Sequence, residues 1–439
     1  MLDAVKAMPR YLSYKDSGVE WLGEIPEHWE IKPLKHTLKL ISEKTFSSQS
    51  SLPYIGMENI ESWTSHFLES KTEVEGLANK FESHDILFGK LRPYLAKVAL
   101  AKYSGICSTE ILVYRPKNNA DFFKYLLISS SFIKLVDAST YGSKMPRASS
   151  GFIGIQRLPL PYQEEQTTIV TYLDRKTVQI DQAVQIKQQQ IALLKERKQI
   201  LIQNAVTRGL DPHTPLRDSG VEWIGEIPAH WIVTKLGHYA VVTNGSTPSR
   251  DVPRYWESGS VPWLASGKVN EFEINTPSEL ITESAFRECS LRLYPVGTII
   301  IGIVGQGKTR GTSAVLNLEA AINQNVAGIV PKGGLLSRFL HRYLVQAYEQ
   351  VRNYGKGSNQ EALNCEIVRS IKIAVPPLDE QTAIAIHIET QSAKIDRAIA
   401  LQQQQIERLK EYKATLINSA VTGKIKVPGV VEGESKEVA

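Results

Sequence analysis

The strongest constraint on the fold is a peptide that occurs twice. The string DSGVEWLGEIPEHW at Asp16–Trp29 returns as DSGVEWIGEIPAHW at Asp218–Trp231, 202 positions later. A second echo, PYQEEQ at 161–166 and PPLDEQ at 376–381, is followed in each copy by a long similar segment. This period is far longer than the roughly 20–50 residues of solenoid repeats. The sequence therefore predicts a tandem duplication of one whole module, with loops that differ between the copies.

Each copy mixes strand-like and helix-like segments between these two echoes. The β-like runs include 85–89 and 298–304, and each copy has an extended stretch that ends at Pro116 or Pro331. A helix-like segment follows, FFKYLLISSSFIKLV in the first copy and RFLHRYLVQAYEQV in the second. Alternating and helical apolar periods in one module are typical of an α+β fold.

A long heptad pattern closes each copy. Apolar residues recur every seven positions through 165–206 and again through 380–421, which predicts helices about 60 Å long. Polar residues interrupt the pattern at matching places, so we expect the two helices to pair; separate packing of each helix on its own module remains the alternative. The predicted seam residues are Leu173, Ile180, Val184, Ile191, Leu194, Leu201, Ile388, Ile395, Ile399, Ile406, Leu409 and Leu416.

The composition fits an ordinary globular protein and sets few limits on function. The 439 residues include 51 basic and 46 acidic side chains, a net charge of +5, which permits a nucleic-acid partner without requiring one. Three separated cysteines form no CxxC pair, which favours neither a zinc site nor a disulfide framework. The first residues lack the apolar core of a secretory signal, so we expect a cytoplasmic location.

The repeated peptide carries charge of the wrong sign for DNA. Asp16, Glu20, Glu24, Glu27 and Glu30 form an acidic strip that phosphate would repel. We therefore expect Trp21 and Trp29 to dock into a hydrophobic seat and to lock the module against the long helices. Stacking of these rings on DNA is the alternative.

Taken together, the repeated opening peptide, the closing PYQEEQ or PPLDEQ and the glutamine-rich heptad helices resemble the specificity (S) subunit of a type I restriction–modification system. The resemblance covers nearly the whole chain. It implies two target recognition domains joined by two long antiparallel coiled-coil helices that act as a spacer, with one domain for each half of a bipartite, asymmetric DNA target. The implied boundaries are 1–160 and 209–374 for the recognition domains, 161–208 and 375–425 for the spacer helices, and 426–439 for a disordered tail.

The resemblance also implies a non-catalytic chain that acts with partners. It implies double-stranded DNA, two methyltransferase (M) subunits and restriction (R) subunits as partners, and no membrane. S-adenosylmethionine would belong to the adenine-N6 methyltransferase subunits, and ATP and Mg to the endonuclease subunits, so we expect no cofactor and no metal in this chain.

Basic loops in paired positions are the predicted DNA contacts. Each module has one such loop after a β-like run, 89–94 in the first copy and its expected counterpart 305–311 in the second, and another loop after its helical segment. Lysine, arginine and amide side chains suit phosphate and base edges. These residues are Lys90, Arg92, Lys144, Arg147, Lys268, Lys308, Arg310, Lys356, Asn359 and Gln360.

A second class of function rests on Gly302–Thr309, which matches the phosphate-binding pattern GxxxxGK[ST]. A working P-loop needs a helix directly after Thr309, whereas RGTSAVLNL predicts a strand. A P-loop nucleotide-binding protein is therefore the alternative to DNA recognition.

Overall fold

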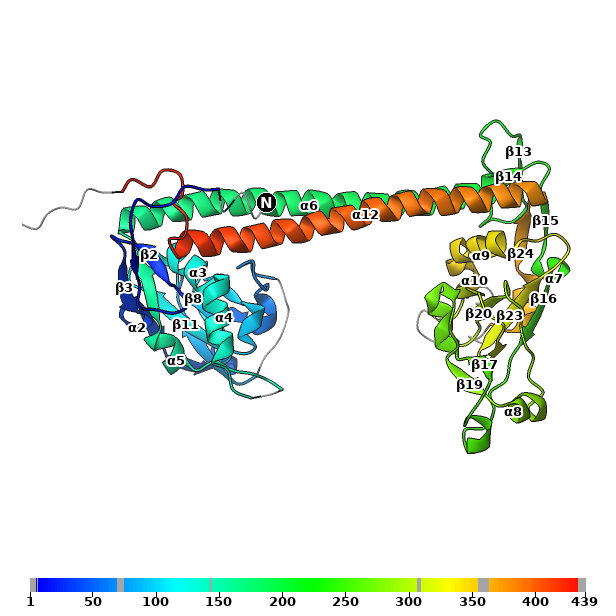
Figure 1. The fold of residues 1–439 in the computed structure, drawn as a ribbon, viewed down its shortest axis with the longest axis horizontal. Helices are drawn as coiled ribbons and strands as arrows, with labels where there is room; N and C mark the ends of the chain where they lie inside the picture. Colours follow the sequence, from blue (N-terminus) through cyan, green and yellow to red (C-terminus); the bar gives the residue numbers. More distant parts are fainter. Residues whose placement is uncertain are drawn as a thin grey trace, which may run out of the picture. The chain divides into compact units, whose positions relative to one another are not determined.

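The computed structural model describes residue 5 and residues 7–68, 75–142, 144–305, 309–353 and 363–432. The chain divides into two compact units, residues 1–189 with 402–439 (unit 1) and residues 190–401 (unit 2). Each unit holds one module and part of two long helices, α6 (Gln163–Arg208) and α12 (Leu378–Val421), as Figure 1 shows. Within the described residues, no helix combines the length and the apolar character needed to span a bilayer.

The module of unit 1 is built from short strands in four sheets. Their orders are β1-β2, β12-β3, β4-β11-β8-β9 and β5-β7-β10-β6. The strands are β1 (Tyr14–Asp16), β2 (Glu24–Pro26), β3 (Glu30–Pro33), β4 (Leu38–Ile41), β5 (Lys44–Phe46), β6 (Tyr54–Ile55), β7 (Leu77–Phe81), β8 (Ile86–Gly89), β9 (Val98–Leu100), β10 (Gly105–Ser108), β11 (Ile111–Pro116) and β12 (Arg157–Leu160). The helices are α2 (Leu34–Thr37), η1 (Ser47–Gln49), η2 (Met57–Asn59), η3 (Pro93–Leu95), α3 (Ala120–Ile128), α4 (Ser130–Ala138) and α5 (Ser150–Ile155).

The module of unit 2 shares the central strand order and the parallel strand pair of unit 1, but its remaining strands are arranged differently. Its sheets have the orders β13-β14, β15-β24, β16-β23-β20-β21-β18 and β19-β17-β22. The strands are β13 (Leu216–Asp218), β14 (Glu226–Pro228), β15 (Ile232–Lys235), β16 (Ala240–Asn244), β17 (Val261–Leu264), β18 (Glu273–Ile274), β19 (Glu279–Ile281), β20 (Ile299–Gly302), β21 (Ser313–Leu316), β22 (Ala321–Ile322), β23 (Val326–Pro331) and β24 (Lys372–Val375). The helices are α7 (Leu236–Tyr239), η4 (Pro253–Tyr255), η5 (Ser266–Glu271), α8 (Glu283–Glu288), α9 (Ser337–Gln346), α10 (Tyr348–Asn353) and α11 (Cys365–Ser370).

The sheet orders identify equivalent strands in the two modules. The central run β4-β11-β8-β9 corresponds to β16-β23-β20-β21, and the parallel pair β6-β10 corresponds to β17-β22. In each module one amphipathic helix, α3 or α9, buries its apolar face in the core. Phe122 and Leu126 of α3 and Phe339 and Leu344 of α9 are almost fully buried. The predicted α+β fold, present twice, is confirmed.

The two long helices run antiparallel, and the polar residues of their heptad pattern pair across the seam. In unit 1, Lys413 lies 2.7 Å from Asp181, and Lys187 bonds to Gln402 and Gln405. In unit 2, Lys198 lies 2.7 Å from Asp396. By the repeat, Asp396 is the counterpart of Asp181, and Lys413 is that of Lys198. The same ion pair therefore occurs once in each unit, and the predicted antiparallel helix pair is confirmed.

The seam positions are shielded from solvent. Leu173, Ile180, Ile191, Ile388, Ile395, Ile406 and Leu416 are buried, and Val184, Leu194, Leu201, Ile399 and Leu409 are half-buried. Near the helix ends the long helices also join the module cores, because Leu173 and Leu416 pack in the core of unit 1 and Ile388 in that of unit 2.

The end of the described chain corrects one expectation. Residues 426–439 were expected to be a disordered tail, but Val427 and Val430 are buried in the core of unit 1. Lys426 also donates its backbone N–H to Pro9, and Glu432 accepts from the Leu12 N–H. The prediction is wrong for 426–432, because these apolar side chains find a place against the start of the chain; 433–439 lie outside the described residues.

Candidate nucleic-acid interface

The repeated peptide acts as a structural anchor in both units. Trp29 and Trp231 are buried, and each indole Nε1–H donates to a glutamate at the start of a long helix, Glu165 at 3.1 Å or Glu380 at 3.0 Å. The preceding histidine of each peptide contacts the same carboxylate. Trp21 is half-buried against Phe132. The predicted seat for the tryptophan rings is confirmed, and it leaves Trp29 no surface for DNA.

Two predicted DNA loops of unit 1 are joined by backbone hydrogen bonds. The loop after β8 contains Lys90, whose C=O accepts from the Ala148 N–H at 2.9 Å. The Arg92 N–H donates to Pro146 at 2.8 Å, and Arg92 holds a left-handed φ of 50°. The segment 146–148 therefore lies along 90–92, and the two loops present one surface.

The four predicted side chains on this surface are not equivalent. Arg92 and Lys144 are exposed, whereas Lys90 and Arg147 are half-buried. Arg147 makes a two-point pair with Glu110 at 3.0–3.2 Å, and this hydrogen bonding raises the pKa of the guanidinium. The carboxylate already compensates the charge of Arg147, so Arg92 and Lys144 are the better placed of the four to attract phosphate.

The loops of unit 2 are only partly described. Arg310 is half-buried beside Gly302, with its C=O accepting from Arg352, and its buried Nε makes no hydrogen bond within the described part of the chain. Lys268 is paired with Glu271 at 2.7 Å and donates to Thr276, so it is a weaker candidate for phosphate than an unpaired lysine. The remaining predicted contacts, Lys308, Lys356, Asn359 and Gln360, lie outside the described residues.

Hydrogen bonding corrects the expected alignment of the two loops. The sequence suggested that Gly89–Tyr94 corresponds to 305–311. In the structure, the Ile303 N–H donates to Asn325 at 3.0 Å and its C=O accepts from Leu363, just as Lys90 bonds to Glu110 and Ala148. Ile303, which is buried, therefore occupies the position of Lys90. The repeat offset grows from 202 positions at the opening peptide (16 to 218) to 215 at the closing one (161 to 376), so the second copy is longer between them, and this hides the equivalence from a sequence comparison.

The structure does not support the P-loop alternative. The residues after Thr309 lead into β21, which pairs antiparallel with β20, instead of into a helix. Gly311 donates its N–H to the Gly302 C=O, which closes the two strands as a hairpin. In the described chain that follows Thr309, the next element is a strand, so no helix N-terminus lies there to hold a phosphate. Among the described residues, no group of three or more His, Cys, Asp or Glu side chains could hold a metal ion.

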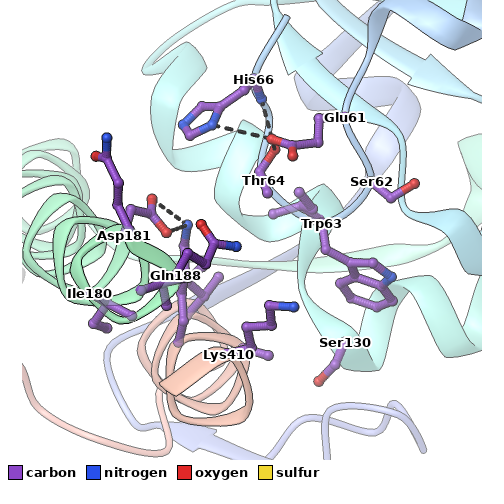
Figure 2. A pocket seen from close by; sticks show the side chains of 16 residues that line it. Glu61, Ser62, Trp63, Thr64, His66, Ser130, Ile180, Asp181, Gln188 and Lys410 are labelled. Atoms are coloured by element: carbon purple, nitrogen blue, oxygen red, sulfur yellow. Dashed lines mark hydrogen bonds and ion pairs between the residues drawn. The ribbon is translucent and has the colours of Figure 1, made fainter. Parts of the chain in front are cut away.

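A cleft of about 660 Å³ lies in unit 1 between the module and the long helices. Figure 2 shows Trp63 on the module side and Lys410 on α12 facing the same space. Its acidic groups are already paired, Glu61 with Thr64 and His66, and Asp181 with Lys413. We assign this cleft no role in DNA binding.

Comparison with known proteins agrees with this architecture of two specificity modules. The family described as "Type I restriction modification DNA specificity domain" matches residues 26–196 and 228–411, one match in each repeat. The chain belongs to this family.

Curated relatives match this chain over nearly its whole length or over part of it. The chain is 26% identical over 430 residues to the putative type I restriction enzyme MjaX specificity subunit of Methanocaldococcus jannaschii, covering 92% of this chain and 96% of the relative. It is 25% identical over 182 residues to the type I restriction enzyme EcoR124I/EcoR124II specificity subunit of Escherichia coli, covering 39% of this chain and 45% of the relative.

Solved structures share the fold at lower sequence identity. The HsdS subunit of Thermoanaerobacter tengcongensis matches with a TM-score of 0.55 and 18% identity, covering 91% of this chain and 98% of that one. A second match comes from a structure described as "Structural basis underlying complex assembly and conformational transition of the type I R-M system". Its TM-score is 0.70 at 18% identity, and it covers 90% of this chain and 98% of that one.

Proposed function

We propose that this chain is the DNA-recognition subunit of a type I restriction–modification complex and that each module reads one half of a bipartite target. The observation that carries the proposal is the duplicated specificity domain, whose copies share one backbone arrangement but carry different side chains on the loops. Different side chains on the same frame would read different bases. The two half-sites are therefore expected to differ, and the target is expected to be asymmetric.

The chemistry is assigned to partner subunits. The chain would dock two methyltransferase subunits, which bind S-adenosylmethionine and methylate adenine, and restriction subunits, which use ATP and Mg. Exposed apolar residues on α6, Val178 and Ile186 in unit 1 and Leu193 and Ile200 in unit 2, support docking of partner helices. This chain would supply recognition and no catalytic step, and it would act in the cytoplasm, where the DNA is.

The proposal is tested by mapping methylated adenines in genomic DNA from cells that express this chain with its methyltransferase partners. The expected result is one motif made of two specified half-sites around an unspecified gap. Cells with the partners but without this chain serve as the control. Methylation without a bipartite motif, or the same motif in the control, would contradict the proposal.

The long helices are proposed to set the unspecified gap. Adding one heptad to both helices, after Gln189 and after Gln405, keeps the seam pattern and adds about 10 Å. The gap in the methylated motif is expected to lengthen by about three base pairs, at roughly 3.4 Å each. An unchanged gap in an assembled, active complex would contradict the role of the helices as a spacer.

A further inference from the structure

In each module a short turn joins the sheet that holds the parallel strand pair to the central sheet. In unit 1 the turn is 108–110, made of the last residue of β10 and the two residues before β11; in unit 2 it is 323–325, between β22 and β23. The two turns share one hydrogen bond between a side chain and the backbone. The Ser108 hydroxyl accepts from the N–H of residue 110 at 3.2 Å, and the Asn323 side-chain oxygen accepts from the N–H of residue 325 at 3.1 Å.

Each turn lies directly against the basic loop of its module. The Glu110 C=O accepts from the Lys90 N–H at 2.9 Å, and the Asn325 C=O accepts from the Ile303 N–H at 3.0 Å. The C=O of the same loop residue accepts from the segment that follows the module's helices: Lys90 from the Ala148 N–H, and Ile303 from the Leu363 N–H. The turn, the basic loop and the segment that follows the helices therefore lie side by side on the surface proposed to contact DNA.

The side chains on the two turns differ completely, as Ser-Thr-Glu and Asn-Gln-Asn. In unit 1, Glu110 holds the guanidinium of Arg147. In unit 2, Gln324 is exposed, and its Oε1 accepts a hydrogen bond from the Thr247 hydroxyl. This bond orients the amide, so that the Nε2 donors and the second lone pair of Oε1 remain available for a ligand.

We propose that this turn is a sequence-reading element and that Gln324 contacts an adenine in the half-site of the second module. A glutamine amide offers the donor and acceptor that match adenine N7 and N6 in the major groove. In the first module the equivalent turn carries Glu110, which pairs with Arg147, so the two modules present different groups at this position. This inference rests on the proposed function and adds the residues that carry the difference between the half-sites.

The test uses the full chain assembled with its methyltransferase partners, and methylated motifs are mapped in genomic DNA. Gln324→Ala is expected to make one adenine position degenerate in one half-site and to leave the other half-site unchanged, with about tenfold or greater loss of discrimination there. Thr247→Val, which removes the orienting hydroxyl, is expected to relax the same position less. Asn317→Ala, an exposed amide of the same module that bonds to Asn275, is the matched control and should leave the motif unchanged.

An unchanged motif with Gln324→Ala, or equal relaxation of both half-sites, would overturn the inference. If Gln324→Ala abolishes methylation, the base preference at each position is measured instead, by competition binding of the purified complex to duplexes that carry single base changes. Retained preference for every position of the wild-type half-site then counts against the inference, and loss at one adenine supports it. Failure of the proposed function would look different, because the unmodified chain would then give no bipartite motif.

Discussion

The two modules share a backbone frame but not the side chains on it. In both, a loop residue, Lys90 or Ile303, bonds through its peptide groups to the preceding turn and to the following segment. Peptide hydrogen bonds do not depend on the side chain, so the frame survives when every neighbouring side chain changes. A duplicated module can therefore acquire a new specificity without rebuilding its fold.

The anchors of the two units differ in strength although their motif is the same. Glu165 is nearly buried, with its side chain 6% exposed, and accepts from three groups: Tyr11 at 2.6 Å, Trp29 and His28. The Glu380 side chain is 36% exposed, and among the described residues it hydrogen-bonds with His230 and Trp231. The start of the chain thus reinforces the anchor of unit 1.

The packing of the module helix also differs between the units. In unit 1, the Tyr125 hydroxyl of α3 donates to Asp174 of α6 at 2.6 Å. The corresponding position in α9 is Arg342, whose guanidinium lies 4.6 Å from the centre of the Phe272 ring. Beside it, the buried His341 replaces the half-buried Lys124 of unit 1. Unit 2 therefore holds a titratable ring in its interior where unit 1 has a partly solvated lysine.

The largest effect is expected from removing the buried indole of either anchor. Trp29→Ala and Trp231→Ala should each lower the free energy of unfolding of their own unit by about 3–5 kcal/mol, because a large cavity is left in the core. Hydrogen-exchange mass spectrometry, which follows peptides of each unit separately, measures this. Trp63→Ala, at 40% exposure, is the control and should cost less than about 1 kcal/mol. Equal loss of protection in both units from one substitution would contradict their independence.

The second-largest effect is expected from acid, which should destabilise unit 2 through His341 more than it destabilises unit 1. Burial lowers the pKa of His341 to about 4, below an unfolded value of about 6.5, so the unfolded state binds more protons between these pH values. The free energy of unfolding of unit 2 should therefore fall by up to roughly 3 kcal/mol as the pH drops from 6.5 to 4. Thermal unfolding across this range measures the effect.

His341→Gln is the matched variant for the acid effect. The amide can still donate to the Ser313 C=O that the ring contacts at 3.2 Å, but it does not titrate. The variant should flatten the pH dependence of unit 2 and leave that of unit 1 as it was. An equally steep dependence in the variant would assign the effect to other groups.

Smaller effects are expected from neutralising the anchor carboxylates. Glu165→Gln should destabilise unit 1 by about 1–3 kcal/mol, because an amide cannot accept from all three buried donors. Glu380→Gln should cost less than about 1 kcal/mol, since water can reach the donors it leaves. Denaturant unfolding of both variants tests the comparison, and equal losses would show that the contact of Tyr11 with Glu165 adds nothing.

The smallest effect concerns the basic loops of unit 1. Arg92→Ala should reduce the slope of log K against log salt for DNA binding by about 0.9, the value for one lost phosphate contact. Arg147→Ala should reduce it by less, because Glu110 already compensates its charge. Binding of the assembled complex to its target across a salt series measures both slopes. A larger change for Arg147 than for Arg92 would reverse this ranking.

The features of the fold that repeat or that follow a local period could be predicted from the sequence. The duplication is visible in the printed letters, and the heptad pattern predicted helices that the structure places at Gln163–Arg208 and Leu378–Val421. The acidic character of the opening peptide predicted a structural role, and its buried tryptophans agree. Period and composition are properties of neighbouring residues, so they can be read without knowing the fold.

Only the tertiary structure decided which distant residues meet. The sequence does not indicate that Glu110 pairs with Arg147 or that Ile303 occupies the position of Lys90. It also does not indicate that Val427 packs in the core of unit 1. These contacts join segments separated by long loops, and closing such loops is governed by packing and hydrogen bonding across the whole module. The sequence by itself determined that two recognition modules and two paired helices exist; the fold decided which side chains each module presents.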